Sequence, residues 1–447
     1  MIGTVRDVNS RGQGVLVPDD GGKVYFVDGV LPGEMVRLAV ISEKKGYGVG
    51  RLVELLEPSP HRVTPRCSWF GRCGGCQLQH GSYDVQLRIK ENAVRSAMER
   101  LAGVQLESIV CEPSPSAWGY RNKASFPVQF RKGGRIGFFR VGSHELVPID
   151  GCPVLMPHLD GLYRSFRSTL LPSLSGSFRA FYDERRNRGM LRHVVFRGNR
   201  AGQSMIMPVV TSLRDRVLRL RIEKGLRRVR TELSGVGSAL WNINPRKGNR
   251  ILGDETVPIW GDGLISEVVS GAMLQYDGTA FFQVNPDQVE ALFRYAAHLA
   301  AELDGSVVEL YAGVGALTSL LARQARSVLA VEEWLPAVER LSLNMEANGL
   351  DNVRALCGRA EDLLPQLTAE RPQTVVLDPP RSGCASEVMD AVDESTALRL
   401  LYVSCNPATL ARDVRIMMDK GWKLRQVRSF DLFPQTCHVE TVCLMSR

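Results

Sequence analysis

At 447 residues the chain exceeds one ordinary domain, so we expect two or three. Hydrophobic residues make up 44% and charged residues 23%, as in soluble globular proteins, and no run of about 18 apolar residues, the length of a membrane-spanning helix, occurs. The N-terminus lacks a signal-peptide pattern, so we expect a cytoplasmic protein whose ten cysteines are thiols or metal ligands rather than disulfides.

The net charge of +8 is unevenly distributed along the chain. Residues 151–260 contain 20 Lys/Arg and 8 Asp/Glu, whereas residues 261–447 contain 16 and 25. A basic middle joined to an acidic C-terminal part indicates that one part binds a polyanion. Residues 185–188 hold three arginines just after Phe181 and Tyr182, as nucleic-acid surfaces often do. A solvated basic face is the alternative.

Residues 1–60 contain about five short β-rich runs separated by Gly- and Asp-rich turns. This spacing predicts a small closed barrel of the OB kind, a common oligonucleotide-binding scaffold. The Pro32-Gly33-Glu34 turn, followed by an alternating strand, resembles the TRAM domain of RNA-modifying enzymes. The charges of this module nearly cancel, so a purely structural barrel is the alternative.

Three cysteines fall within ten residues of one another after a Pro-rich linker: Cys67, Cys73 and Cys76. The two glycines beside them let the backbone wrap closely, so the pattern indicates a metal or iron–sulfur site. A zinc site would usually show a second pair nearby, and none follows. The fourth ligand must come from a distance. Cys152, in a Gly/Pro turn, is our first choice, followed by Cys111 and then His80.

Residues 61–265 are expected to form a central β-rich domain that carries the Cys motif and the basic surface. Apolar residues at helical spacing predict a helix over residues 82–101, and residues 120–260 are rich in strand patterns. The Arg-rich segment 214–230 is predicted to be a helix that contacts phosphates.

Residues 266–447 alternate between apolar runs and helical segments. The predicted strands cover residues 307–310, 327–333, 374–377, 400–403 and 441–445. This rhythm is typical of a doubly wound, mostly parallel α/β sheet.

The first turn of this α/β domain carries a sign of a nucleotide-like cofactor. Gly313 and Gly315 follow the first strand, and Glu332 ends the next strand, where a carboxylate can accept both ribose hydroxyls. A third glycine and a phosphate-gripping Lys are missing, which favours S-adenosylmethionine over NAD or ATP. Asp378, held before two prolines, is expected to point into the same cleft.

Cys405 follows the predicted strand 400–403 in a Ser-Cys-Asn-Pro turn. Reactive groups of open α/β sheets gather outside the carboxyl ends of the strands, so this thiol is placed to reach a substrate. A small buried cysteine is the alternative for any single thiol.

Five motifs occur in order along the chain: Cys67/Cys73/Cys76, Phe-Phe-Gln-Val-Asn at 281–285, Asp-Pro-Pro-Arg at 378–381, Ser-Cys-Asn-Pro at 404–407 and His-Val-Glu-Thr-Val at 438–442. With these motifs, essentially the whole chain resembles the RNA uracil-C5 methyltransferase family. The barrel and the Cys motif resemble the branch that methylates 23S ribosomal RNA. The bacterial transfer-RNA branch usually lacks both, whereas some archaeal transfer-RNA enzymes share this architecture.

The resemblance implies a C-terminal Rossmann-like class I methyltransferase domain, preceded by an OB-like TRAM barrel and a β-rich central iron–sulfur domain. It implies that Cys405 is the nucleophile and Glu440 the base. Gln283, Tyr311, Glu332 and Asp378 would contact S-adenosylmethionine, and Cys67, Cys73, Cys76 and Cys152 would hold a [4Fe-4S] cluster. Ala316, where many relatives carry a polar residue, and Cys437 receive no role.

The chemistry of this family requires these residue types. Carbon 5 of uracil is a poor nucleophile, and addition of a thiolate to carbon 6 produces an enolate that can attack a methyl donor. A base must then remove the proton from carbon 5. The expected partner is ribosomal RNA, with transfer RNA as the alternative, and neither a membrane nor an obligate protein partner is implied.

Three other functions compete with this interpretation. Amino-group methylation of a base also uses an Asp-Pro-Pro-like motif but needs no cysteine, and Arg381 and Cys405 argue against it. An inactive RNA-binding iron–sulfur protein would not need both Cys405 and Glu440. A radical methylthiolating enzyme requires cysteines spaced by three and then two residues, whereas here the spacing is five and then two.

Overall fold

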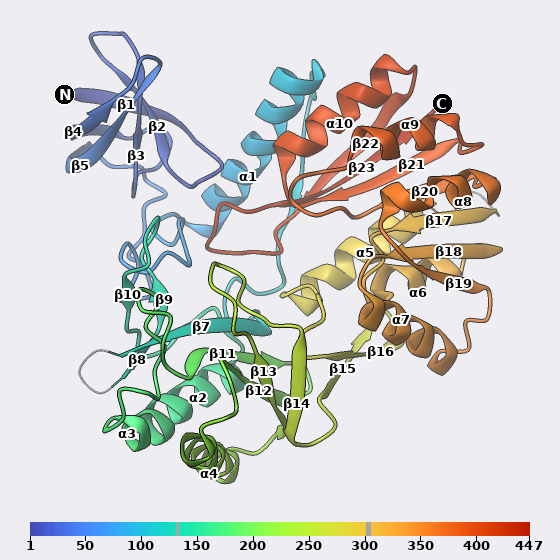
Figure 1. Cartoon of the computed structure of the whole chain (residues 1–447). Helices are drawn as coiled ribbons and strands as arrows, with labels where there is room; N and C mark the ends of the chain where they lie inside the picture. The colour runs from blue at the N-terminus through green and yellow to red at the C-terminus, as the bar shows by residue number, and fades with distance from the viewer. Residues whose placement is uncertain (131–133, 301–304) are drawn as a thin grey trace. The chain divides into compact units, whose positions relative to one another are not determined.

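The computed structural model describes residues 1–130, 134–300 and 305–447 (Figure 1). The chain forms two compact units. Unit 1 comprises residues 1–71, 76–117 and 287–447, and unit 2 comprises residues 72–75 and 118–286. The helix expected over residues 82–101 therefore belongs to the same unit as the C-terminal α/β sheet. Within the described ranges, no helix combines the length and the apolar character needed to cross a bilayer.

The N-terminal part of unit 1 is a closed five-stranded barrel with strand order β1-β2-β3-β5-β4. Its strands are β1 (Ile2–Val8), β2 (Gly14–Pro18), β3 (Val24–Val27), β4 (Met35–Glu43) and β5 (Tyr47–Glu57). Alternate side chains point inward and form a core that includes Val5, Leu16, Val27 and Leu38. The predicted N-terminal barrel is confirmed.

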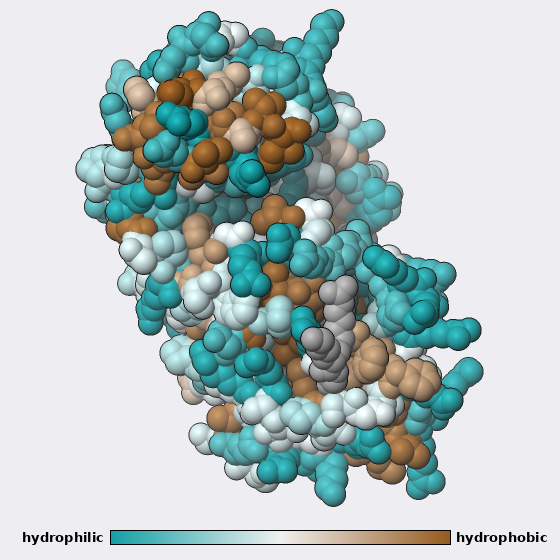
Figure 2. Space-filling model, turned by 90° about the vertical axis from the view of Figure 1, so that its left-hand side faces the viewer, coloured by the Kyte–Doolittle hydropathy of each residue, from teal (hydrophilic) through white to brown (hydrophobic). Residues whose placement is uncertain are grey.

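The outer wall of the barrel is partly apolar. Val40, Ile41 and Val53, on β4 and β5, are 44%, 65% and 57% exposed. Apolar side chains also gather in the upper part of the surface in Figure 2. The same two strands also carry the exposed Arg37 and Arg51, so this wall mixes apolar and cationic side chains.

Unit 2 is built on a six-stranded sheet with the order β14-β13-β12-β11-β7-β8. The strands of this sheet are β7 (Lys123–Gln129), β8 (Arg135–Ile136), β11 (Leu191–Gly198), β12 (Ser204–Val210), β13 (Val236–Ile243) and β14 (Glu255–Trp260). Two further pairs of strands in unit 2 form small sheets of their own: β9 (Phe138–Phe139) with β10 (Leu146–Val147), and β15 (Leu264–Val269) with β16 (Ala272–Asp277). Its helices are α2 (Pro157–Ser165), η2 (Phe166–Leu170), α3 (Leu171–Leu174) and α4 (Arg216–Glu232). The predicted β-rich pattern and the Arg-rich helix are both present.

The C-terminal sheet of unit 1 has eight strands in the order β19-β18-β17-β20-β21-β23-β22-β6. They are β6 (Cys111–Glu112), β17 (Ser306–Leu310), β18 (Ser327–Glu332), β19 (Val353–Cys357), β20 (Thr374–Leu377), β21 (Arg399–Ser404), β22 (Lys423–Phe430) and β23 (Glu440–Ser446). The five strands from β19 to β21 run parallel, and β23 is antiparallel to both of its neighbours. The predicted doubly wound sheet is therefore present, with an antiparallel strand beside β21.

Helices cover this sheet and bury its central strands on both faces, as parallel strands require. They are α1 (Tyr83–Ala97), η1 (Met98–Ala102), α5 (Pro286–Ala300), α6 (Ala316–Ala322), α7 (Leu335–Ala347), η3 (Ala360–Leu363), α8 (Leu364–Ala369), α9 (Ser386–Glu394) and α10 (Pro407–Asp419). Helix α10 packs against α1, η1 and α9. The N-terminal helix α1 is thus part of the support of the C-terminal sheet.

Candidate active site

The predicted site residues of unit 1 line one edge of the C-terminal sheet. Glu332 ends β18, while Tyr311, Asp378 and Cys405 directly follow β17, β20 and β21. Because these four strands are parallel neighbours, their carboxyl ends lie side by side. Glu440 begins the antiparallel β23, so it lies at the same edge.

Strand pairing places Cys405 next to Glu440. Ser404 of β21 is directly opposite Thr441 of β23. Residues opposite each other in an antiparallel pair have Cα atoms about 5 Å apart, and one further step along both strands leads to Cys405 and Glu440. Cys405 and Glu440, which are predicted to be the nucleophile and the base and stand 35 positions apart in sequence, are therefore neighbours in the fold.

The turn that carries Cys405 is fixed by its own hydrogen bonds. Asn406 caps α10, since its Oδ1 accepts from the N–H of Ala408 at 3.1 Å, and its Nδ2 donates to the carbonyl of Arg381 at 2.9 Å. The Ser404 hydroxyl accepts from the N–H of Asn406 at 3.1 Å. These contacts hold the half-buried thiol at the strand end.

The charged groups near Cys405 shift the pKa of its thiol in opposite directions. Burial raises the pKa of the Cys405 thiol to about 11, with a further increase from the Glu440 and Asp378 carboxyls, while Arg381 lowers it. A cation near the thiol favours the thiolate, the form in which cysteine attacks. Arg381, to which the sequence analysis assigned no role, is therefore the group of this site that supports ionisation.

Glu440 is a buried carboxyl with spare hydrogen-bonding capacity. It is 2% exposed, and its Oε2 atom has no hydrogen-bond partner among the residues that the structure describes. Burial, reinforced by Asp378, raises the pKa of Glu440 well above its usual range, and Arg381 opposes this shift. A carboxylate with a raised pKa binds a proton more strongly, which suits a general base.

Asp378 follows β20, so it lies between Tyr311, which follows β17, and Cys405, which follows β21. Burial raises the pKa of its carboxyl to about 7. Its backbone N–H is 3.4 Å from the carbonyl oxygen of Leu310, which ties the start of the Asp-Pro-Pro-Arg segment to β17. The carboxyl can therefore exist in either protonation state near neutral pH.

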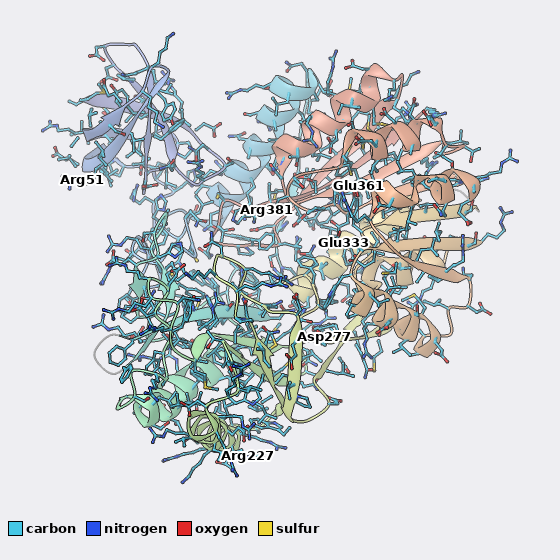
Figure 3. The ribbon with its side chains drawn as sticks, in the orientation of Figure 1. Arg51, Arg227, Asp277, Glu333, Glu361 and Arg381 are labelled. Carbon is cyan, nitrogen blue, oxygen red and sulfur yellow. The ribbon has the colours of Figure 1, made fainter. Side chains whose placement is uncertain are left out.

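Glu332 and Tyr311 border a pocket of about 160 Å³. Glu332 accepts from the N–H of Gly313 and from the N–H of Trp334, both at 3.0 Å, which leaves lone pairs for further donors. Tyr311 has a φ of 67°, a left-handed conformation that side chains of its size rarely adopt and that marks functional sites. Glu333 and Glu361, labelled in Figure 3, also line this pocket.

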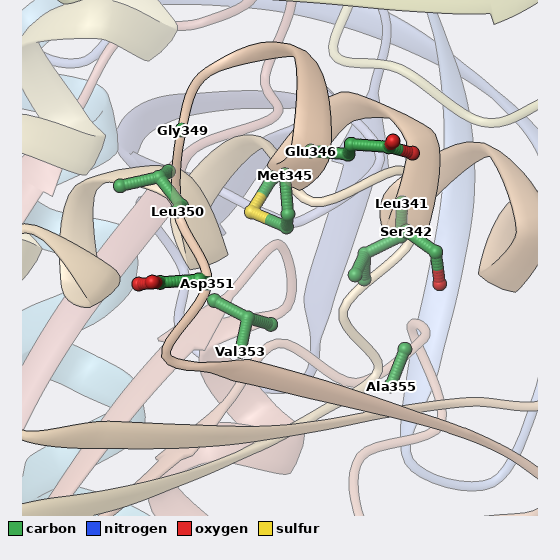
Figure 4. A pocket seen from close by; sticks show the side chains of 9 residues that line it. All are labelled: Leu341, Ser342, Met345, Glu346, Gly349, Leu350, Asp351, Val353 and Ala355. Carbon is green, nitrogen blue, oxygen red and sulfur yellow. The ribbon is translucent and has the colours of Figure 1, made fainter.

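A second pocket, of about 310 Å³, lies between α7 and β19 (Figure 4). Its lining comprises Leu341, Ser342, Met345, Glu346, Gly349, Leu350, Asp351, Val353 and Ala355. None of the predicted site residues is among them, so the smaller pocket beside Tyr311 and Glu332 is the candidate cofactor site.

The sequence analysis missed Glu309, a buried acid in the middle of β17. Burial raises the pKa of its carboxyl to about 8, and the carboxyls of Asp378 and Glu332 add to the increase. A charged residue inside the apolar run Val307–Leu310 was the signal, because such a group is rarely buried without a purpose.

Replacing Glu309 with Gln is expected to raise the midpoint of thermal unfolding, and to raise it more at pH 8 than at pH 5. The folded state holds the Glu309 proton up to about pH 8, whereas an unfolded Glu loses it near pH 4.3. Between these values the wild-type protein loses about 1 kcal/mol of stability per pH unit through this group, and Gln removes that loss. Thermal unfolding followed by circular dichroism at both pH values tests this. An equal shift at both would contradict it.

The four predicted cluster ligands are divided between the units. Cys67 and Cys76 belong to unit 1, and Cys73 and Cys152 to unit 2. The Cys67 N–H donates to Gln79 Oε1 at 3.2 Å, and the Gly75 N–H donates to Cys73 Sγ at 3.4 Å. Within the described ranges, no three His, Cys, Asp or Glu side chains come together as metal ligands. Each unit thus contains two of the four predicted ligands, and the [4Fe-4S] cluster stays a prediction.

The other ligand candidates lie in different surroundings. His80 is buried with Nε2 3.2 Å from the carbonyl oxygen of Val30, and burial lowers its pKa. Cys111 is buried in the edge strand β6, where burial raises the pKa of its thiol. Cys152 has its backbone N–H bonded to Asp160 Oδ1 at 2.7 Å in a turn before α2. A turn position suits a ligand better than a buried strand.

Gln283, the remaining predicted cofactor contact, belongs to unit 2. It is buried, and its carbonyl oxygen accepts from Asn122 Nδ2 at 3.1 Å. The stacked rings of Tyr276 and Phe282, with centroids 4.4 Å apart, fix the preceding residue. Its contact with a cofactor stays a prediction.

Comparisons with known proteins show similarity to a family of RNA methyltransferases. Residues 267–447 match the model of the tRNA (uracil-5-)-methyltransferase family. An uncharacterized RNA methyltransferase of Halalkalibacterium halodurans is 36% identical over 99% of this chain and 96% of its own length. One of Gloeobacter violaceus is 38% identical, over 95% and 92%.

A solved structure is similar along its whole length. The Pyrococcus abyssi tRNA (uracil-54, C5)-methyltransferase, in complex with S-adenosyl-L-homocysteine, superposes with a TM-score of 0.77 and 25% identity, and the match covers 100% of both chains. In open α/β sheets, ligands bind outside the carboxyl ends of the strands, where this row of acids and one thiol lies. The chain therefore belongs to the RNA uracil-5 methyltransferase family and is an S-adenosylmethionine-dependent RNA methyltransferase.

Proposed function

We propose that the enzyme methylates carbon 5 of one uridine in 23S ribosomal RNA through a covalent bond between Cys405 and carbon 6 of the uracil. The observation that supports this mechanism is the pairing of β21 with β23, whose continuation makes Cys405 and Glu440 neighbours at the sheet edge. Amino-group methylation would need neither group.

The proposed reaction balances with these two residues. The Cys405 thiolate adds to carbon 6, and the electron pair of the double bond moves to an enolate. Carbon 5 attacks the methyl group of S-adenosylmethionine, the bond from the methyl group to the positively charged sulfur breaks, and neutral S-adenosylhomocysteine leaves. Glu440 takes the proton of carbon 5, the double bond re-forms, and the bond from sulfur to carbon 6 breaks. Arg381 favours the thiolate at the start and at the end of the cycle.

Tyr311, Glu332 and Asp378 are proposed to bind S-adenosylmethionine. The pocket beside them supports this, because a carboxylate at the end of the second strand of such a sheet can accept ribose hydroxyls. Gln283 is proposed as a further contact from unit 2.

The basic face of α4 supports RNA as the partner. Asp215 caps this helix by accepting from the N–H of Leu218 at 3.0 Å, and its apolar side is buried. The exposed cations on and just before the helix are Arg214, Arg216, Arg221, Lys224, Arg227, Arg228 and Arg230. Figure 3 labels Arg227 among the long side chains that extend outward. An arginine-rich face of this kind matches the geometry of phosphates.

Neutralising this face is expected to weaken RNA binding in a salt-dependent way. The triple variant Arg216→Gln/Arg221→Gln/Lys224→Gln removes three exposed cations of α4. If each contacts a phosphate, the slope of log affinity against log salt concentration falls by about 2. The control Arg354→Gln/Arg415→Gln/Lys420→Gln removes three cations that are ion-paired in unit 1. Filter binding with an RNA fragment would contradict the assignment if both triples changed the slope equally.

A trapping experiment tests the proposed mechanism. The protein and S-adenosylmethionine are mixed with ribosomal RNA fragments in which 5-fluorouridine replaces uridine, and the mixture is separated under denaturing conditions. Fluorine at carbon 5 cannot be removed as a proton, so a covalent complex should persist. The fragment that yields a shifted band identifies the substrate. Methyl transfer without any band would overturn the covalent mechanism.

Transfer RNA is the second candidate substrate. It is favoured by the structural similarity to the Pyrococcus abyssi enzyme, which methylates uracil-54 of tRNA and matches the chain along its whole length. The barrel and the Cys motif, through their resemblance to the ribosomal branch, favour 23S RNA. The same gel with 5-fluorouridine transfer RNA decides between them.

We also propose that Cys67, Cys73, Cys76 and Cys152 hold a [4Fe-4S] cluster. Support comes from the chemistry of the four thiols and from the Gly75 N–H that donates to Cys73 Sγ, a bond that favours a charged sulfur. Glycine is also required at position 74, where a Cβ atom would lie 2.9 Å from the carbonyl oxygen of Phe139. Iron analysis and visible absorption of anaerobically purified protein test this. Protein without iron under these conditions would refute it.

A further inference from the structure

The segment 431–439, which connects β22 to β23 and leads directly to Glu440, has no regular secondary structure. It is nevertheless buried, apart from the half-buried Phe433 and His438. Buried irregular backbone must find hydrogen-bond partners elsewhere in the fold. Several of these partners lie more than 300 positions earlier in the sequence, on α1 and on the residues that follow the Cys motif.

An ion pair fastens the first half of this segment. Lys90, on α1, donates to Asp431 Oδ1, and the exposed fraction of both side chains is 0%. Lys90 also donates to the carbonyl of Phe433 at 3.1 Å, and the N–H of Phe433 donates to Asp431 Oδ1 at 3.1 Å. Two buried charges are expensive to desolvate, and a hydrophobic pair would often be at least as stable. The pair therefore specifies a geometry more than it adds stability.

A reciprocal amide pair fastens the second half. Gln86 Nε2 donates to Gln435 Oε1 at 3.1 Å, and the N–H of Gln435 donates to Gln86 Oε1 at 2.9 Å. Gln86 precedes Lys90 by four residues, so both side chains project from one face of α1. Gln435 has a φ of 73°, a strained conformation that persists only where the surroundings fix it.

The residues directly after Cys76 also bind Gln435. The N–H groups of Gln77 and Leu78 both donate to the carbonyl of Gln435, at 3.1 and 3.0 Å. Leu78 also packs with Cys437, Val85 and Ile89 in a small buried cluster. The backbone that leaves the Cys motif is thus bonded to the segment that ends in the base.

We propose that Gln86 and Lys90 are positioning residues for proton removal by Glu440. They hold the 431–439 segment so that the Glu440 carboxyl stays at the strand end beside Cys405. Gln77 and Leu78, which directly follow the Cys motif, support the same segment. The inference rests on the proposed role of Glu440 as the base.

The role predicts a specific kinetic defect. If the base is displaced while the thiol is not, Cys405 still adds to uracil and the methyl group is still transferred, but the last step slows. A misplacement of about 1 Å can cost about 100-fold in rate. The methylated RNA should then remain covalently attached to Cys405, even with ordinary uridine.

Two variants test this, Gln86→Leu and the double variant Lys90→Met/Asp431→Asn, which avoids an unpaired buried charge. The control is Arg88→Met, which changes an exposed side chain on the other side of α1. With ordinary RNA, we expect turnover to fall by about 100-fold and a covalent band to accumulate, and with 5-fluorouridine RNA we expect the band to form at the parental rate. Melting curves identify any variant that fails to fold. Gln86→Leu changes no charge, so the test can still be decided with this variant if the double variant does not fold.

Two outcomes would overturn the inference. Folded variants could turn over like the parent, or adduct formation with 5-fluorouridine RNA could fall together with turnover, which would indicate a general structural role. Failure of the proposed covalent mechanism is distinguishable from both, because the parent protein itself would then give no band with 5-fluorouridine RNA.

Discussion

Replacing Cys405 with alanine is expected to abolish the covalent complex with 5-fluorouridine RNA and to lower methyl transfer by at least about 10⁴-fold. Without sulfur at this position nothing adds to carbon 6, so carbon 5 stays a poor nucleophile. The half-buried thiol lies at the carboxyl end of β21, and its turn is fixed by Asn406 and Ser404, which alanine leaves in place. The fold and the affinity for RNA should therefore survive.

The control for this variant is Cys357→Ala, which removes an exposed thiol from β19. It should keep the covalent band and most of the activity. Methyl transfer is measured with a labelled methyl donor, and RNA binding is measured separately. If Cys405→Ala retained a tenth or more of the activity, amino-group methylation would become the better account of the site.

The row of site residues was predictable because each member stands next to a strand that the sequence marks clearly. Asp378 and Cys405 follow continuous apolar runs, and Glu332 ends one, so a parallel sheet necessarily brings them to one edge. The position of Glu440 was predictable only through the family resemblance. Periodicity does not reveal that β23 runs antiparallel beside β21.

The support of the site could not be predicted from the sequence. Lys90 and Asp431 are 341 positions apart, and nothing in their local sequence indicates that they meet. The helix at residues 82–101 was expected within the central domain 61–265, yet it packs on α10 in unit 1. Local patterns determine elements, whereas the pairing of distant buried charges depends on the complete fold.

Replacing Glu440 with glutamine is expected to stop the reaction after methyl transfer, before the proton of carbon 5 is removed. Glutamine has nearly the same shape, but it cannot accept the proton of carbon 5. Turnover should fall by about 10²- to 10⁴-fold, the usual contribution of a general base. Because the thiol and the cofactor residues are unchanged, addition and methyl transfer should still occur, and one methylated RNA per enzyme should remain attached to Cys405.

A denaturing gel with ordinary uridine RNA and a labelled methyl donor measures this directly, since only the arrested product carries label, RNA and protein in one band. The control Glu387→Gln changes an exposed carboxylate in the first turn of α9 and should turn over without a band. A Glu440→Gln protein that neither turns over nor accumulates a band would show that this carboxyl is needed before addition, and another group would then have to remove the proton.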